Sequence, residues 1–522
     1  MTRQIVIASS ILAFVLAGVL PVLYMVASAL LPAGSQEGAG PVHFFATLLQ
    51  STRQRQLLFN TVFLSSMSAT IALIIGAPLG LLLAKSDLPL KKSIALLFIM
   101  PLLLPPYIMA VAWWDLSLHL PVPVWMLSGP FGSTLVLSTI YIAIPMLLVM
   151  AAVRGIDPRL EEAARLSASW PLVLRRITLP LSMPALALSW LLVFILCIGE
   201  YSVPSFFRYQ VFSAESFTLF SAMYDFRSAT LQALPIAILA LAASAAAALI
   251  LRRSGLEQVS LSAAGPVCRM GLGRWRKAVA LAVLGMALVL VALPLSGMAV
   301  TAAGLGSLAP VWAAAGQSLQ RSLSYGLIGA VILTIIGFFM GYGVAKRAVP
   351  GSRAADLVCL LVFALPGSVL AIGLIGLLNR PETAFVYGSC LVIFAGYTAK
   401  YTALTERIIQ AQVGQIPSSM EEAAQVAGAG WIRRTLFITI PLSRRGIVAS
   451  WLVAFIFCLR DTDITMLIYP PGRDTLPVRT FTLMANGTPE LVAGLCLLMF
   501  AALLLPSLAL WLLWGRKTGA GA

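Results

Sequence analysis

Charged residues are scarce in this sequence. Only 10% of the 522 residues are Asp, Glu, Lys or Arg, whereas 60% are hydrophobic and the mean hydropathy is +0.95. A soluble domain carries about 25% charged residues, and it could not keep this much apolar surface away from water. The composition therefore indicates a chain whose solvent is the lipid bilayer.

Histidine and paired cysteine are also nearly absent. The two histidines, His43 and His119, lie far apart, and none of the six cysteines belongs to a CxxC pair. Five of the cysteines fall inside apolar runs, where a thiol behaves as a small apolar side chain. Metal centres need clustered ligands, so the sequence predicts no metal site, no resident cofactor and no catalytic residue.

Acidic residues number 19 against 35 basic ones, which gives a net charge of +16. Such a charge is also typical of nucleic-acid-binding domains. Here, however, the basic residues form short clusters between long apolar runs rather than one basic face or tail. Membrane proteins concentrate Lys and Arg in cytoplasmic loops in this way, and we expect no nucleic-acid partner.

Apolar runs of the length that crosses a bilayer, about 17–25 residues, recur along the whole chain. They predict twelve spans, near residues 5–31, 58–84, 93–115, 130–153, 184–204, 230–251, 278–300, 322–345, 355–378, 385–405, 446–468 and 491–514. The first run is longer than the core of a cleaved signal peptide and fits a spanning helix instead. The predicted fold is an all-α integral membrane protein with about twelve transmembrane helices.

The basic residues predict the orientation of these spans. With the amino terminus in the cytoplasm, most of them fall on cytoplasmic segments, and the opposite side holds Arg53, Arg55, Arg208, Arg227, Arg321, Arg380, Arg473 and Arg479. This bias follows the positive-inside rule. We expect a multi-pass membrane protein with both termini in the cytoplasm.

The chain contains an internal repeat. A constant offset of 261 residues pairs Ala84-Lys85 with Ala345-Lys346, and it pairs ITLPLS at 177–182 with ITIPLS at 438–443. Because each half spans an even number of times, the repeat is parallel. The predicted organisation is a first six-span half at 1–253, a cytoplasmic linker at 254–277 and a second six-span half at 278–522.

The loop between the fourth and fifth spans of each half carries most of the functional information. The two loops cover residues 157–183 and 416–444, and both contain a predicted short helix. Asp157 is expected to cap the first helix, and Ser418 with Glu421 has the pattern of a capping box. Two prolines, Pro180 and Pro441, are expected to interrupt the helix before the next span.

These loops resemble the EAA loop of membrane subunits of ATP-binding-cassette importers. That signature has Glu-Ala-Ala, a glycine four residues after the second alanine, and a hydrophobic-x-Leu-Pro ending. The first loop matches at Glu162, Ala163, Ala164 and Pro180, and the second at Glu422, Ala423, Ala424, Gly428 and Pro441. The first loop has Ser167 or Ala168 at the glycine position and is one residue shorter. The fused arrangement resembles the ferric-iron and thiamine permease branch.

The resemblance implies a transport subunit of a bacterial inner (plasma) membrane rather than an enzyme. Each loop would dock on one of two copies of a cytoplasmic ATPase through Glu161, Glu162, Ala163, Ala164 and Pro180 or through Glu421, Glu422, Ala423, Ala424, Gly428 and Pro441. ATP and Mg would bind to that partner, because this chain lacks a GxxxxGK[ST] phosphate loop. A periplasmic or extracellular binding protein would deliver the substrate. The alternative for the loops is a pair of amphipathic helices that lie on the membrane.

Ionisable residues near the outer ends of the fifth spans need an explanation, because a charge at mid-membrane costs about 2.5–3.5 kcal/mol. They are Glu200, Arg460, Asp461 and Asp463. In one interpretation Arg460 pairs with Asp461 or Glu200 and fixes helix packing. In the other, the three acids line the transport path and favour a cation. In the tenth span, Lys400 and Glu406 are expected to snorkel or to pair locally.

The sequence thus predicts the permease subunit of an ATP-driven, binding-protein-dependent importer. Ferric iron is the first substrate expected, from the resemblance and the three acids, while thiamine, phosphonates, polyamines and other small solutes stay open. A secondary transporter driven by an ion gradient can also have twelve spans in parallel halves, but it leaves the paired loops unexplained. A membrane enzyme lacks any nucleophile or metal-ligand constellation to support it.

Overall fold

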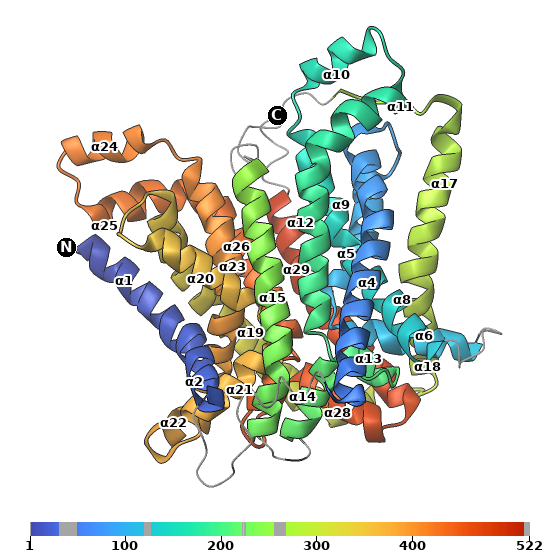
Figure 1. The fold of residues 1–522 in the computed structure, drawn as a ribbon, viewed down its shortest axis with the longest axis vertical. Helices are drawn as coiled ribbons and strands as arrows, with labels where there is room; N and C mark the ends of the chain where they lie inside the picture. The colour runs from blue at the N-terminus through green and yellow to red at the C-terminus, as the bar shows by residue number, and fades with distance from the viewer. Residues whose placement is uncertain are drawn as a thin grey trace. The chain divides into compact units, whose positions relative to one another are not determined.

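The computed structural model describes residues 2–30, 50–119, 127–221, 223, 226–254 and 268–515, and Figure 1 shows their course. Within these ranges the regular structure is helical, apart from an isolated bridge between Ser86 and Met270. The predicted all-α class is therefore confirmed. Most of the predicted linker at 254–277 and the residue His43 lie outside the described residues.

Eight helices of the described chain are long and apolar enough to cross a membrane, and two bent pairs bring the number to ten if each is one span. The eight are Thr2–Ser28, Thr52–Lys85, Pro130–Arg154, Trp170–Ile198, Ser228–Leu251, Gly273–Ala303, Ala309–Ala345 and Trp431–Arg460. The predicted spans at 385–405 and 491–514 are also helical, but neither is counted among the ten. The full set of twelve stays a prediction.

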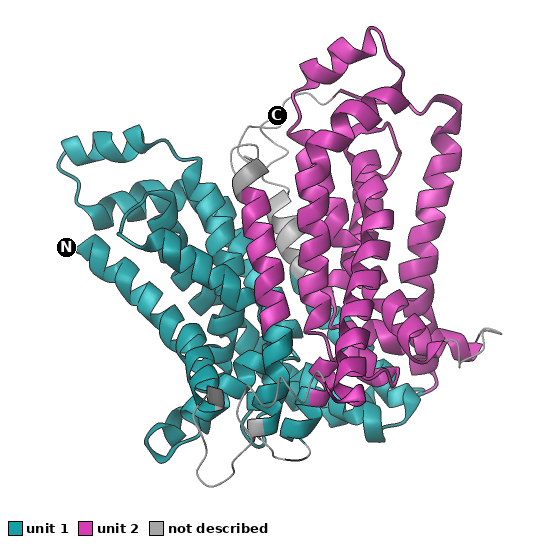
Figure 2. Ribbon diagram, in the orientation of Figure 1, with its two compact units in different colours: residues 1–48, 216–237, 305–522 teal, residues 49–215, 238–304 magenta. Residues whose placement is uncertain are grey.

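By their internal contacts the helices form two compact units (Figure 2): unit 1 is residues 1–48, 216–237 and 305–522, and unit 2 is residues 49–215 and 238–304. Unit 2 holds α4 (Thr52–Lys85), α5 (Lys91–Leu103), α6 (Pro106–His119), α8 (Pro130–Tyr141), α9 (Ala143–Arg154), α10 (Pro158–Arg165), α11 (Trp170–Val173), α12 (Leu179–Ile198), α13 (Ser202–Phe206), α17 (Arg276–Ala287) and α18 (Leu293–Ala303). Unit 1 holds α1 (Thr2–Phe14), α2 (Leu20–Leu30), α19 (Ala309–Ala345), α20 (Ser352–Ala364), α21 (Gly367–Leu378), α22 (Ala384–Tyr387), α23 (Leu391–Gly414), α24 (Ser418–Val426), α25 (Trp431–Arg434), α26 (Ile440–Arg460), α27 (Thr465–Ile468), α28 (Leu476–Asn486) and α29 (Pro489–Gly515). The boundary between the units falls within α14 (Phe212–Ser221) and α15 (Phe226–Ser254).

The first span of each sequence half packs with helices of the other half. In unit 1, α1 and α2 contact α19, α21 and α23, and in unit 2, α17 and α18 contact α5 and α6. Glycines allow the close approach: a Cβ on Gly373 would lie 2.6 Å from the Pro21 carbonyl oxygen, and one on Gly297 would lie 3.1 Å from the Leu116 Cα. The compact units therefore cut across the two halves of the sequence repeat.

The third predicted span of each half is broken, which corrects the continuous spans expected at 93–115 and 355–378. Helix α5 meets α6 at 106°, and α20 meets α21 at 105°. Pro105 and Pro366 lie at the two breaks. A proline lacks the N–H that would continue the helix and drives the preceding residue toward an extended backbone, so each chain turns there instead of running straight.

Small residues of the repeat bring the second span of each half against the fourth. In unit 2 a Cβ on Gly76 of α4 would lie 2.5 Å from the Ile142 carbonyl oxygen. In unit 1 a Cβ on Gly341 of α19 would lie 2.6 Å from the Glu406 carbonyl oxygen. Helices in lipid associate through such small-residue contacts, because there is no hydrophobic driving force between them.

Four of the described spans contain a π-turn that is followed two residues later by a proline. The turns are η1 (Val15–Val19), η2 (Leu174–Thr178), η4 (Leu288–Ala292) and η6 (Thr435–Thr439), and the prolines are Pro21, Pro180, Pro294 and Pro441. A π-turn shifts the hydrogen bonds by one residue, which accommodates the missing proline N–H. The expected interruption at Pro180 and Pro441 is therefore wrong, since both helices run through.

Candidate functional site

The first loop folds into the short helix α10 and returns through α11 to the fifth span. In Figure 1, α10 and α11 lie beyond one end of the unit 2 bundle that α4, α9 and α12 form. The Asp157 carboxylate accepts a hydrogen bond from the Arg159 N–H at 3.0 Å, which confirms the expected N-cap. The Arg165 guanidinium lies 5.1 Å from the Trp170 ring and holds the turn between the two helices.

The second loop forms the equivalent helix α24, but its start differs from the expectation. The helix begins at Ser418 itself, and the capping position is Pro417, which has no side-chain hydrogen bond to give. The capping box predicted for Ser418 and Glu421 is therefore wrong. The reason is that the Glu421 carboxylate is held instead by Tyr342 and Lys346 at the end of α19.

In the first loop, Glu161 points inward and is completely buried. Its carboxylate forms an ion pair with Lys85 at the end of α4, and it accepts a hydrogen bond from Thr178 Oγ1 at 2.6 Å. A carboxylate without water is stable only when it is paired and hydrogen-bonded. This contact therefore ties α10 to the second span and to the π-turn that precedes α12. We call the three residues the first inner cluster.

Unit 1 repeats this arrangement around Glu421. Its carboxylate lies 3.5 Å from Lys346 Nζ and accepts hydrogen bonds from Thr439 Oγ1 at 3.4 Å and from the Tyr342 hydroxyl at 3.1 Å. Lys85 and Lys346 are related by the offset of 261. The second inner cluster, Lys346, Glu421 and Thr439, is wetter, because 13% of each charged side chain is exposed, against 1% and 0% in the first.

The opposite faces of α10 and α24 are exposed and match each other. Glu162 and Ala163 in the first loop, and Glu422 and Ala423 in the second, lie at the surface. One turn further on, Leu166 is 91% exposed and Val426, at the equivalent position, is 90% exposed. Single exposed apolar residues are ordinary, but here both loops expose the same pair of an acidic and an apolar side chain. We call these the docking faces.

The two loops differ at the position of the family glycine. Gly428 has φ of +81°, and the N–H groups of Gly428 and Ala429 close the end of α24 on the carbonyls of Gln425 and Ala424. The first loop instead continues with Ser167 and has no positive φ between 157 and 183. The first loop lacks the glycine of the signature, and α10 and α24 thus end in different ways.

Replacing Gly428 by alanine is expected to destabilise the second loop by about 1 kcal/mol, because a Cβ is strained in the left-handed region. Ser167→Gly is the matched control and should change little, since φ at that position is not positive. The thermal unfolding midpoint of the purified protein is the measurement. Equal effects of the two substitutions would contradict the strain argument.

The segment that leads into α17 lies against the first inner cluster. The Met270 N–H donates to the Lys85 carbonyl at 2.8 Å, and the Leu272 N–H donates to Asp87 Oδ1 at 3.0 Å. The latter bond holds the pKa of the Asp87 carboxyl below its usual value. In unit 1 the start of α1 lies near the second inner cluster in the same way. The Arg3 guanidinium lies 5.7 Å from the ring of Tyr342, whose hydroxyl binds Glu421. Sequence reasoning did not predict these contacts.

The acid of the first half, Glu200, is buried at the end of α12. Its carboxylate accepts hydrogen bonds from the N–H and the hydroxyl of Ser202, at 2.8 and 2.5 Å. Its carbonyl oxygen accepts a hydrogen bond from the Ser213 hydroxyl at 2.9 Å. These bonds fix the turn between α12 and α14, while the pairing of Glu200 with Arg460 and its place on the transport path both stay predictions.

The acids of the second half gather at the break between α20 and α21. Asp461 is buried and accepts hydrogen bonds from the Tyr401 hydroxyl at 2.5 Å and the Thr465 N–H at 2.9 Å. Asp463 lies against Gly367, the first residue of α21. Lys400 donates to the carbonyls of Phe363, at 3.1 Å, and of Leu365. The lysine thus binds carbonyls that the proline break leaves unpaired.

The remaining predicted charges have local partners. The Arg460 guanidinium lies 4.9 Å from the Phe457 ring, and Glu406 lies 3.9 Å from Arg407. Among the described residues no group of three or more His, Cys, Asp or Glu could hold a metal ion.

The residues that sequence reasoning missed are Lys85 and Lys346; both stand at the same place in the repeat, which was the available signal.

Comparison with known proteins gives evidence that is independent of the structure. Residues 76–230 match the family model of the binding-protein-dependent transport system inner membrane component. The chain is 25% identical over 178 residues to the spermidine/putrescine transport system permease protein PotC of Haemophilus influenzae, covering 34% of this chain and 68% of that protein. It is 23% identical over 192 residues to the putative 2-aminoethylphosphonate permease PhnV of Salmonella typhimurium, covering 37% and 72%.

A third relative is the putative ferric transport system permease protein FbpB 1 of Haemophilus influenzae, 23% identical over 165 residues that cover 31% of this chain and 26% of that protein. The family implies, in general, an ATPase and a substrate-binding protein as partners. With several apolar helices in the structure, it also supports a multi-pass inner-membrane location. Residues 76–230 thus match this family, and together with the relatives they support an inner-membrane permease of an ATP-binding-cassette importer.

Proposed function

We propose that the chain couples ATP hydrolysis on partner subunits to import, and that the docking faces of α10 and α24 are the points of attachment. One observation carries the proposal: each loop helix exposes one glutamate and one apolar residue outward and locks the other glutamate inward onto two spans. A helix on a membrane surface would place its apolar residues toward the bilayer. Here the inward side is instead polar and already occupied.

The inner clusters explain how movement of a loop would reach the membrane. Glu161 joins α10 to the end of α4 and to the start of the helix that becomes α12, so a displacement of α10 displaces both. Glu421 does the same for α19 and α26. Two copies of the ATPase, one per loop, fit this arrangement, and ATP and Mg would bind to them. The loops and both termini would then face the cytoplasm.

For the cargo we propose ferric iron first, from the family branch that the fused halves resemble. Thiamine, phosphonates, polyamines and other small solutes are the alternatives; the relatives are named for polyamine, phosphonate and ferric transport. The partner that delivers the cargo would be a binding protein on the outer face. An ion-gradient-driven secondary transporter is the rival class.

The test is uptake into proteoliposomes that contain the chain, a candidate ATPase and a candidate binding protein, with radiolabelled ferric iron, spermidine and 2-aminoethylphosphonate offered in turn. We expect uptake only when ATP and all three components are present. Uptake of one cargo alone identifies the substrate. Uptake that ignores ATP and follows an imposed ion gradient would overturn the coupling proposal and favour the rival class.

A further inference from the structure

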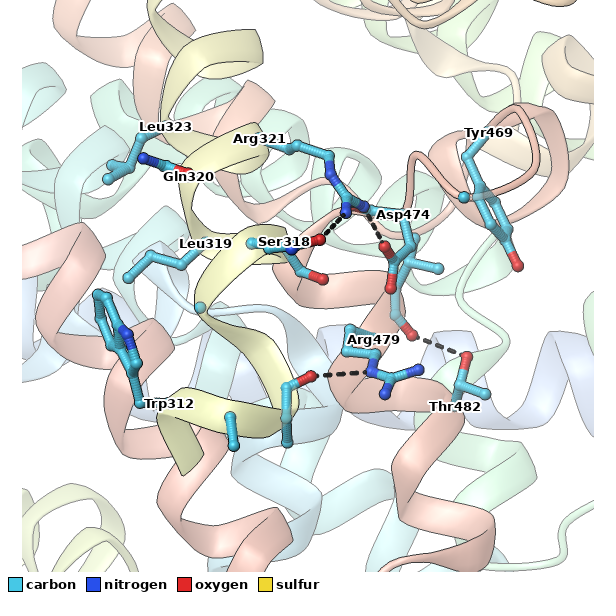
Figure 3. A pocket seen from close by; sticks show the side chains of 16 residues that line it. Trp312, Ser318, Leu319, Gln320, Arg321, Leu323, Tyr469, Asp474, Arg479 and Thr482 are labelled. Atoms are coloured by element: carbon cyan, nitrogen blue, oxygen red, sulfur yellow. Dashed lines mark hydrogen bonds and ion pairs between the residues drawn. The ribbon is translucent and has the colours of Figure 1, made fainter. Parts of the chain in front are cut away.

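A cavity of about 940 Å³ lies in unit 1, between the first turns of α19 and the segment that runs from Tyr469 into α28 (Figure 3). Its position relative to the loops follows from the length of α19. Arg321 precedes Lys346 by 25 residues along the chain, which is about 37 Å of helix, whereas the hydrocarbon core is about 30 Å thick. The cavity is thus at the opposite face of the membrane from the second inner cluster.

Two guanidinium groups and one carboxylate line this cavity. The Arg321 side chain is paired with the Asp474 carboxylate and also donates to Gln317 Oε1 at 3.1 Å. The Arg479 side chain is half-buried, and its Nε donates to the Ala314 carbonyl at 3.1 Å. Among the described residues no carboxylate pairs with Arg479. Its terminal nitrogens therefore bring one uncompensated positive charge to the cavity.

The first repeat shows which residue stands at the position equivalent to Arg479 and how its charge is neutralised there. There the Phe212 N–H binds Thr61 Oγ1 at 2.9 Å, as the Leu476 N–H binds Ser322 Oγ at 2.7 Å. These bonds align residue 212 with 476, and hence Glu215 with Arg479.

In unit 2, Glu215 forms an ion pair with Arg53 at 2.7 Å. The offset of 261 places Ala314 where Arg53 stands. In the second repeat, Arg479 thus takes the place of the acid Glu215, and the uncharged Ala314 takes the place of Arg53. A half-buried charge is costly without a counter-ion, so an anion from outside the chain is the group that this site lacks.

We propose that the cavity binds an oxyanion, a phosphate, phosphonate or carboxylate group, with Arg479 as its charged ligand. Guanidinium is the side chain suited to such planar, multiple hydrogen bonds. The amide of Gln320 and the hydroxyl of Tyr469 supply further polar groups in the lining, whereas the Thr482 hydroxyl already donates to the Val478 carbonyl at 2.9 Å. The exposed ring of Trp312 forms an apolar wall. The site does not depend on the coupling role of the loops, and it takes either a soluble anion or the phosphate of a lipid headgroup.

The test uses the purified full-length chain in detergent, with inorganic phosphate and methylphosphonate as soluble probes and calorimetric titration as the readout. Arg479→Gln should weaken binding by roughly 10- to 100-fold, the effect expected for one charge-assisted contact. Ala314→Glu should do the same while it keeps the arginine, because it recreates the ion pair of the first repeat. Arg473→Gln, an exposed arginine of the same segment, is the control and should leave binding unchanged.

A second arm distinguishes the source of the anion. Native mass spectrometry counts phosphatidylglycerol molecules retained by the wild-type chain and by Arg479→Gln. Loss of one lipid in the variant, with no binding of the soluble probes, assigns the site to a headgroup. Both arms are read with the unfolding midpoint, to establish that the variants are folded. Anion binding and lipid retention that are unchanged in folded Arg479→Gln, or lost equally in Arg473→Gln, would overturn the proposal.

Discussion

Lys85→Met should impair the permease far more than Lys346→Met does. Both lysines pair with the inward glutamate of a coupling loop, but the Lys85–Glu161 pair is fully buried, whereas 13% of each partner is exposed in the Lys346–Glu421 pair. Removing one partner of a buried ion pair costs about 3–5 kcal/mol, because the other charge stays without compensation. Water relieves part of this cost at Glu421. The measurements are the unfolding midpoint and ATP-dependent uptake.

The double variant Lys85→Met with Glu161→Gln separates the effect of an unpaired buried charge from the effect of the lost side-chain contacts. It removes both charges at once, so it should regain much of the stability lost in Lys85→Met. If the first inner cluster also transmits movement, uptake should stay reduced although stability returns. Equal effects of Lys85→Met and Lys346→Met, or a double variant that is no more stable than the single one, would contradict the account of this cluster.

Glu162→Ala together with Glu422→Ala should lower ATP-dependent uptake roughly tenfold or more, with little effect on the stability of the isolated chain. Both side chains are exposed and face away from the inner clusters. Truncating a central contact of an interface costs more than 1 kcal/mol, and about 1.4 kcal/mol is a tenfold change in affinity. Co-purification of the ATPase and uptake are measured side by side.

The matched comparison for these variants keeps the charges and changes the apolar residues. Leu166→Ser with Val426→Ser removes the exposed apolar side chains of the docking faces and should also weaken co-purification of the ATPase. A substitution at Leu90, which is 65% exposed but lies outside the loops, should not. Unchanged assembly and transport in the glutamate double variant would exclude the docking faces as the attachment points.

The fold class could be predicted from the sequence, because long apolar runs specify spanning helices almost independently of tertiary structure. The loops were predictable too, since Glu162 and Glu422 recur at the same place in an internal repeat. The breaks at Pro105 and Pro366 were not, because a proline in a span is compatible with a kink, a π-turn or a true break. Which of these forms depends on neighbouring helices.

The inner clusters show the limit of sequence reasoning for the site. Lys85 stands at the end of a span, where the positive-inside rule already explains a basic residue. Its recurrence as Lys346 marks its place in the repeat but does not indicate that it is buried. Its partner Glu161 is one residue from Glu162 and looks equally exposed. Only the helical turn of α10, fixed by Asp157, sends one glutamate inward and the other outward. The packing of the first span of each half against helices of the other half also depends on tertiary contacts, which the sequence pattern does not show.

The most direct test of the central claim is disulfide cross-linking between the docking faces and the ATPase. Glu162→Cys and Glu422→Cys are introduced separately in a chain without its two half-exposed cysteines, Cys268 and Cys390, and each is paired with cysteines around the groove of a candidate ATPase. We expect cross-links from both positions that change when ATP is added, and none from Leu90→Cys. A transport-competent complex that forms no cross-link at either glutamate position would contradict it.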